Sequence, residues 1–147
     1  MPGSHLSDLE TEISEMAAQA AAIVKDRTGE APDYSEASLG IVEELLDEAS
    51  LHFAALPEDQ ALMLVQSFGC YLLEVGRRTF GGSYLWFEER DQPVLVVGEP
   101  NFHVAMITWD KIRGRLGGDK GDNVPFFFEG FAQRIRGADA GTRALYV

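Results

Sequence analysis

The feature that most constrains the fold is a long apolar stretch, residues 67–87, whose periodicity changes at a pair of glycines, Gly81-Gly82. Before the glycines, apolar and glycine residues recur every three or four positions, which is typical of one helical face. The members of this face are Leu62, Val65, Phe68, Gly69, Leu72 and Gly76. After the glycines comes an aromatic-rich run that is typical of a strand. We therefore predict a central helix that starts near Pro57 and leads directly into a sheet.

Two glycines inside this helix predict close packing. Gly69 and Gly76 lie seven positions apart and so share one side of the helix. A glycine costs about 1 kcal/mol relative to alanine in a helix, so we expect another helix or the sheet to approach both. The single cysteine, Cys70, lies on the same helix and is expected to be a small buried hydrophobe.

Two amphipathic helices are predicted before the central one. The first begins at a capping box formed by Ser7 and Glu10 and ends near Gly29. Its apolar seam consists of Leu9, Ile13, Met16, Ala20 and Ile23. Because an isolated helix of this size is marginal in water, this seam is expected to pack on its own domain or on a second copy. The second helix is expected to be capped by Asp33 and to reach about Ala55. Its apolar stripe consists of Leu39, Val42, Leu46, Ala49, Phe53 and Leu56.

Three strand-like runs, residues 83–89, 94–97 and 102–108, follow the double glycine and are separated by short turns. Short connections of this kind favour an antiparallel meander. Two further helices are predicted, a short one after Thr108 or Asp110 and a last one with Pro125 in its first turn. Of the adjacent rings that follow this proline, at least one is expected to stay exposed.

The predicted fold class is α+β, with N-terminal helices, a central helix, a three-stranded antiparallel meander and C-terminal helices. Residues 1–147 are expected to form a single domain. Within it, residues 1–32 are expected to be peripheral or to form an interface. Residues 138–147 are expected to be a flexible tail whose end docks as a strand or a plug.

The net charge of −12 is distributed unevenly along the chain. Residues 1–60 hold 14 acidic and 2 basic side chains, whereas residues 61–147 hold 10 of each. A strongly acidic half argues against binding to nucleic acid or to an anionic membrane. It favours a basic protein partner or simple solubility. With one cysteine and no visible signal peptide or membrane span, the chain is expected to be cytoplasmic.

Four carboxylates of the second helix form the candidate partner-binding patch: Glu43, Glu44, Asp47 and Glu48. Residues 43 and 47, and residues 44 and 48, are one turn apart, and like charges at this spacing repel weakly. No gain to the fold is visible in the sequence, so we expect the patch to serve either solubility or a basic partner.

The candidate ligand-binding residues are Glu74, Arg77, Tyr84 and Trp86, at the junction of central helix and sheet. Glu74 is the ionisable group among apolar neighbours, and an ion pair with the following arginines is favoured over a catalytic role. His52 and His103 lack the spacing of a metal site and are expected to be structural. We assign no catalytic residue, no metal ligand and no cofactor.

A resemblance covers about residues 60–136. The helix segment Gly69-Cys-Tyr-Leu-Leu-Glu74, the double glycine, the strands and the short basic segment 111–116 are similar to a pattern of bacterial domains of unknown function. Some similar domains are immunity or accessory proteins beside secretion-system effectors. The resemblance implies a non-enzymatic interaction protein. The alternatives are a small-molecule-binding or enzymatic domain with a pocket between central helix and sheet, or a homo-oligomer.

Overall fold

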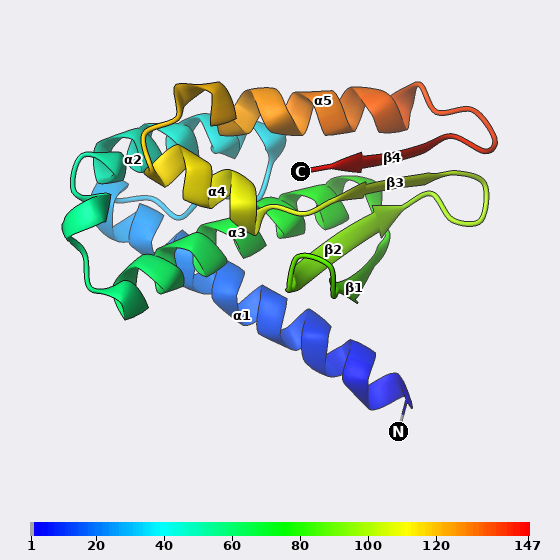
Figure 1. The fold of residues 1–147 in the computed structure, drawn as a ribbon, viewed down its shortest axis with the longest axis horizontal. Coiled ribbons are helices and arrows are strands. Elements are labelled where there is room, and N and C mark those ends of the chain that lie inside the picture. Colours follow the sequence, from blue (N-terminus) through cyan, green and yellow to red (C-terminus); the bar gives the residue numbers. More distant parts are fainter. Residues whose placement is uncertain (1) are drawn as a thin grey trace.

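The structure, a computed structural model, describes the backbone of residues 2–147 and the side chains of residues 8–147 (Figure 1). Its α-helices are α1 (Pro2–Thr28), α2 (Leu39–Ser50), α3 (Glu58–Phe80), α4 (Trp109–Leu116) and α5 (Val124–Arg136). Short 3-10 helices span Glu36–Ser38, Phe53–Ala55 and Lys120–Asp122. Its strands are β1 (Ser83–Phe87), β2 (Gln92–Val97), β3 (His103–Met106) and β4 (Arg143–Tyr146). In the part that the structure describes, no helix is both long and apolar enough to cross a membrane.

The first helix packs along α3 and is part of the core. The buried side chains on its inner side are Ile13, Ala17, Ala20 and Val24. They overlap the predicted seam, which is therefore covered by its own chain. The predicted capping box is wrong as a helix start, because α1 already runs through position 7.

The second helix is shorter than predicted, because 3-10 turns replace both of its ends. Ser35, not Asp33, caps the first turn, and its hydroxyl accepts a hydrogen bond from the Ser38 amide. Asp33 instead accepts from the amide of Ser35, two residues on. At the other end α2 stops at Ser50, before the predicted end near Ala55. The apolar stripe remains on the inner side, with Leu39, Val42 and Leu46 buried.

The central helix has the predicted bounds, beginning after Pro57 and ending just before Gly81, where φ is +76°. Both of its inner glycines allow the predicted close approach. A Cβ at Gly69 would lie 2.4 Å from the Trp109 ring, and one at Gly76 would lie 2.7 Å from the Met106 side chain. Cys70 is fully buried between α3 and α1, and burial raises the pKa of its thiol to about 12.

The sheet has four strands in the order β1-β2-β3-β4, and it is mixed rather than antiparallel. Strands β1, β2 and β3 form the predicted meander. The prediction of a three-stranded antiparallel sheet is wrong, because β4 pairs in parallel with β3. Of the two alternatives expected for the end of the segment 138–147, the structure shows the strand. A parallel neighbour needs a crossover connection, and here α4 and α5 provide it.

The inner face of the sheet is covered by α3 and α5, which places the main core between helices and sheet (Figure 1). Thr108 precedes α4 as expected, but its hydroxyl donates to the Gly69 carbonyl of α3. Asn123 caps α5 by accepting from the Phe126 amide. As predicted, one of the adjacent rings at the start of α5 stays outside, with the Phe126 side chain 74% exposed.

Candidate functional site

The structure brings together three of the four predicted ligand-binding residues. Glu74 is buried on α3, and its Oε1 accepts a hydrogen bond of 2.7 Å from the Tyr84 hydroxyl of β1. Its Oε2 lies 3.3 Å from Nε of Arg78, the ion pair expected from the sequence. The Arg77 guanidinium lies 5.3 Å from the centre of the Tyr84 ring. The fourth residue, Trp86, lies two positions further along β1, and its ring packs on Trp109 instead of joining this cluster.

The cluster around Glu74 is a structural anchor between α3 and β1. Both carboxylate oxygens of Glu74 have partners inside the protein. Burial and the neighbouring Glu74 carboxylate raise the pKa of Tyr84, so this phenol stays protonated. Two residues further along the helix, Leu95 and Met106 fill the space beside Gly76, so helix and sheet are in direct contact there. Helix and sheet leave no room for the predicted ligand pocket beside Gly76, whereas a hollow of about 230 Å³ lies between α1, α3 and the sheet and is lined by Cys70 and Trp86.

The acidic patch on α2 has a role inside the fold that the sequence did not reveal. Arg115 of α4 is buried, and its Nε and Nη2 each lie 2.6 Å from a carboxylate oxygen of Glu43 and Asp47, respectively. The other oxygen of Glu43 accepts a hydrogen bond from the Val124 amide at the start of α5. The expectation that the fold gains nothing from these carboxylates is therefore wrong. Partner binding by the patch stays a prediction.

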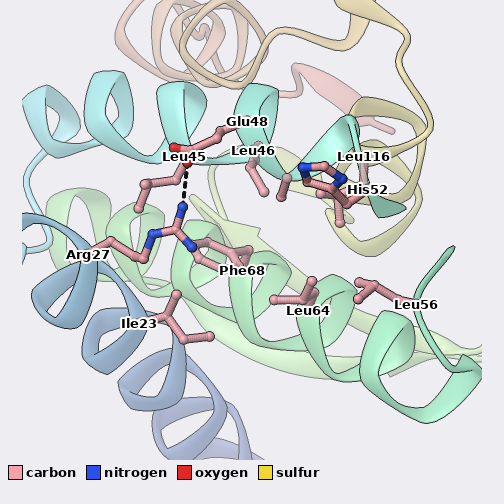
Figure 2. A pocket seen from close by; sticks show the side chains of 11 residues that line it. Ile23, Arg27, Leu45, Leu46, Glu48, His52, Leu56, Leu64, Phe68 and Leu116 are labelled. Carbon is pink, nitrogen blue, oxygen red and sulfur yellow. Dashed lines mark hydrogen bonds and ion pairs between the residues drawn. The ribbon is translucent and has the colours of Figure 1, made fainter. Parts of the chain in front are cut away.

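An apolar cavity lies on the other side of α2, among the helices; we call it the helical pocket (Figure 2). Its volume is about 430 Å³. Apolar side chains from α1, α2, α3, α4 and the loop after α2 form most of its wall: Ile23, Leu45, Leu46, Ala49, Leu56, Leu64, Phe68 and Leu116. The polar groups around it are Arg27, Glu48 and His52. Mostly apolar walls with a few polar groups are typical of small-molecule sites.

The helical pocket lies between α2, which packs mainly on α4 and α5, and α1, which packs on α3. Figure 2 shows the Arg27 side chain reaching from α1 across this gap to Glu48 of α2. The two side chains are 53% and 57% exposed. An exposed ion pair of this kind contributes at most about 1 kcal/mol. The bridge between α1 and α2 is therefore easily opened.

The histidines do not join Glu74 in a common site. His52 lies at the helical pocket, whereas His103 lies at a hollow on the sheet, and Glu74 lines neither. Nδ1 of His103 lies 2.6 Å from a Glu99 carboxylate oxygen. Among the described residues, no group of three or more histidine, cysteine, aspartate or glutamate side chains is placed to hold a metal ion.

A second candidate surface is the side of the sheet that faces away from α3 and α5; we call it the outer sheet face. Its residues line a shallow hollow of about 560 Å³. Its apolar members are Leu85, Phe87, Val94, Val96, Ala105 and Leu145. Its charged members are Glu89 and Arg143. Alternation along each strand accounts for this face, but the sequence did not show which side the helices would leave open.

Comparison of the chain with protein-family models, with curated proteins and with solved structures gives no match. The geometry of these two surfaces is therefore the basis for any functional conclusion.

Proposed function

We propose that this chain is a binding protein that holds a small, neutral, largely apolar molecule in the helical pocket. The observation that carries the proposal is the cavity itself, which is lined by eight apolar side chains beneath the Arg27–Glu48 ion pair. A volume of about 430 Å³ lies within the range of small-molecule sites. The alternative function predicted from the sequence, small-molecule binding, is thus retained at a different place in the fold.

The size of the cavity limits the ligand. A buried cavity of about 150 Å³ is large enough for benzene. At the same ratio, 430 Å³ accommodates up to about 17 carbon atoms. The ligand is therefore a molecule with a medium alkyl chain or two to three fused rings, not a nucleotide or a peptide.

The charges around the cavity favour a neutral ligand. Arg27 is already paired with Glu48, so neither side chain offers a free counter-charge. An anionic ligand would also meet the field of residues 1–60, which carry 14 acidic side chains and 2 basic ones. A cationic ligand would place its charge against apolar walls, where an unpaired charge is costly. A hydroxyl or amide group can instead accept from Arg27 and donate to Glu48.

The leading interpretation from the sequence was an immunity-like interaction protein that uses the α2 carboxylates. That interpretation stays a prediction. The geometry supports it less well, because Glu43 and Asp47 hold Arg115 within the fold.

A fluorescent probe tests the proposal. N-phenylnaphthylamine is neutral, and its emission rises in apolar surroundings. We expect it to bind the wild type and to be displaced by decanol more effectively than by decanoate or decylamine. Ala49→Phe places a ring in the cavity and is expected to weaken probe binding about ten-fold, which corresponds to about 1.4 kcal/mol.

The matched control is Ala18→Phe, which makes the same change at an exposed position of α1 outside the pocket. This variant is expected to bind the probe like the wild type. Failure of the wild type to bind, or equal binding by the Ala49→Phe variant, would contradict the proposal. Displacement by decanoate as effective as by decanol would contradict the neutral class of ligand.

A further inference from the structure

The outer sheet face is apolar, and in the part of the chain that the structure describes it is exposed along both edge strands, whereas its middle is buried. Leu85 of β1 is 47% exposed and Leu145 of β4 is 45% exposed, so large side chains stand in water at both edge strands. Between them, Val94, Ala105 and Ile107 are buried and form a small cluster of their own, separate from the main core. Exposed apolar side chains that gather on one face are typical of an interaction site.

The charge on this face is balanced although the chain as a whole is strongly acidic. No residue from 1–60, the part with the net charge of −12, lines the hollow. One acidic side chain, Glu89, and one arginine, Arg143, lie at its rim. Two copies that meet through this face therefore avoid placing their acidic segments in the interface, which would cost repulsion.

Glu89 and Arg143 lie at diagonally opposite corners of the sheet. Glu89 follows the end of β1, the first strand in the sheet order, and Arg143 begins β4, the last. Strands β1, β3 and β4 all run in the same direction. The reason is that β1 and β3 are both antiparallel to β2, and β4 is parallel to β3. The end of β1 and the start of β4 are therefore at opposite ends of the sheet as well as at opposite edges.

The sheet is nearly square, which matters for how two copies can pair. Four strands spaced about 4.8 Å apart span about 14 Å, and five residues along a strand span about 17 Å. A two-fold axis can lie parallel to the sheet, along the diagonal that joins the two remaining corners. Such an axis places the Glu89 corner of one copy against the Arg143 corner of the other. It also makes the strands of the two copies cross near 90°, one of the two preferred angles for packed sheets.

We propose that the outer sheet face binds a second copy of this chain, with the two sheets crossed at nearly right angles and Glu89 of each copy facing Arg143 of the other. Each interface carries this pair twice, because a two-fold interface is self-complementary. The sheet covers only about 240 Å², well below the roughly 800 Å² per partner of a stable complex. The dimer is therefore weak and forms in the micromolar range or above.

Sedimentation equilibrium between about 1 and 500 µM tests the proposal. We expect a reversible monomer–dimer equilibrium. Leu145→Asp is expected to abolish the dimer. Arg143→Glu and Glu89→Arg are each expected to weaken it at least ten-fold, and the double variant is expected to restore it. All three positions are exposed, and circular dichroism checks that each variant is folded.

Phe126→Asp is the matched control, because this exposed ring lies on α5 and not on the outer sheet face. It is expected to leave the dimer unchanged. A chain that stays monomeric over the whole range, or a dimer that survives Leu145→Asp or is lost in Phe126→Asp, would overturn the proposal. If both single charge reversals weaken the dimer and the double variant does not restore it, the crossed arrangement is wrong.

Discussion

Arg115 is the residue at which three helices meet. It projects from α4 and pairs with Glu43 and Asp47 of α2, while Glu43 also accepts from the first amide of α5. Hydrogen bonds and charge from the two carboxylates raise the pKa of Arg115 although burial acts in the opposite direction. A guanidinium that is 3% exposed must be paired, since an unpaired buried charge is costly.

We expect Arg115→Met to destabilise the fold by about 3 kcal/mol, because it leaves Glu43 without a counter-charge. This expected loss of stability lies at the lower end of the range for breaking a buried ion pair, since Asp47 is half exposed and can be solvated. Urea unfolding measures the change. The control Arg90→Met removes an exposed ion pair with Asp110 and is expected to cost less than about 1 kcal/mol. Equal losses in the two variants would show that Arg115 is not such an anchor.

The same variant is expected to change the pH dependence of stability. The hydrogen bond from Arg115 lowers the pKa of Asp47 below its usual value of 3.8. The stability linked to this group is present above the unfolded pKa and is lost as the pH falls through the lowered folded pKa. The wild type should therefore lose more stability than Arg115→Met as the pH is lowered through this range. Parallel acid unfolding curves would contradict the assignment.

At the scale of elements, α3 organises the fold because other elements reach its backbone at two glycines. At Gly69 the approaching group is the Trp109 side chain of α4, and at Gly76 it is the sheet. A rigid ring cannot move aside as easily as the flexible end of a methionine. Gly69 therefore tolerates a side chain less well than Gly76 does.

We expect Gly69→Ala to destabilise the protein by about 1–3 kcal/mol, as is typical of overpacking, despite the better helix propensity of alanine. Its Cβ would lie 2.4 Å from the Trp109 ring. The control is Gly40→Ala in α2, where nothing lies within 4 Å of the added Cβ. There alanine is expected to stabilise by up to about 1 kcal/mol. Thermal unfolding of both variants checks the signs, and a stabilising Gly69→Ala would refute the close contact.

At the scale of the whole molecule, charge is separated between the acidic N-terminal helices and the neutral remainder. Several carboxylates of residues 1–60 are paired with cations from elsewhere in the chain, as in Glu10–Arg77 and Glu36–Arg136. These pairs offset only part of an excess of 12 negative charges. The remaining repulsion opposes the compact state and is screened by salt.

We therefore expect stability to rise when NaCl is increased from about 20 to 300 mM, because the Debye length falls below the distances between most of these charges. Urea unfolding is the suitable measurement, since urea is uncharged and does not itself add ions. Sucrose of equal osmolality is the control for a general solute effect. An unchanged or lower urea midpoint in salt would show that the ion pairs outweigh the repulsion.

The sequence by itself determined those helices, strands and turns whose formation depends on residues close together in the chain. The central helix between Pro57 and Gly81, the meander after the double glycine and the start of α5 with a proline in its first turn follow from periodicity and turn chemistry. The ends of α2 were less predictable. A 3-10 turn capped by Ser35 replaces the predicted cap at Asp33, and the α-helix stops at Ser50 instead of near Ala55.

The tertiary structure alone decided the features that join distant segments. Arg115 and Glu43 are 72 positions apart, and nothing in either local pattern reveals the pair. Whether the C-terminal segment forms a strand depended on whether α5 returned it beside β3. The helical pocket arises because α2 packs mainly on α4 and α5, whereas α1 packs on α3, and the side chains between the two pairs leave space. Such features depend on how elements are placed in space, and each element's amphipathic pattern specifies its buried side but not its neighbour.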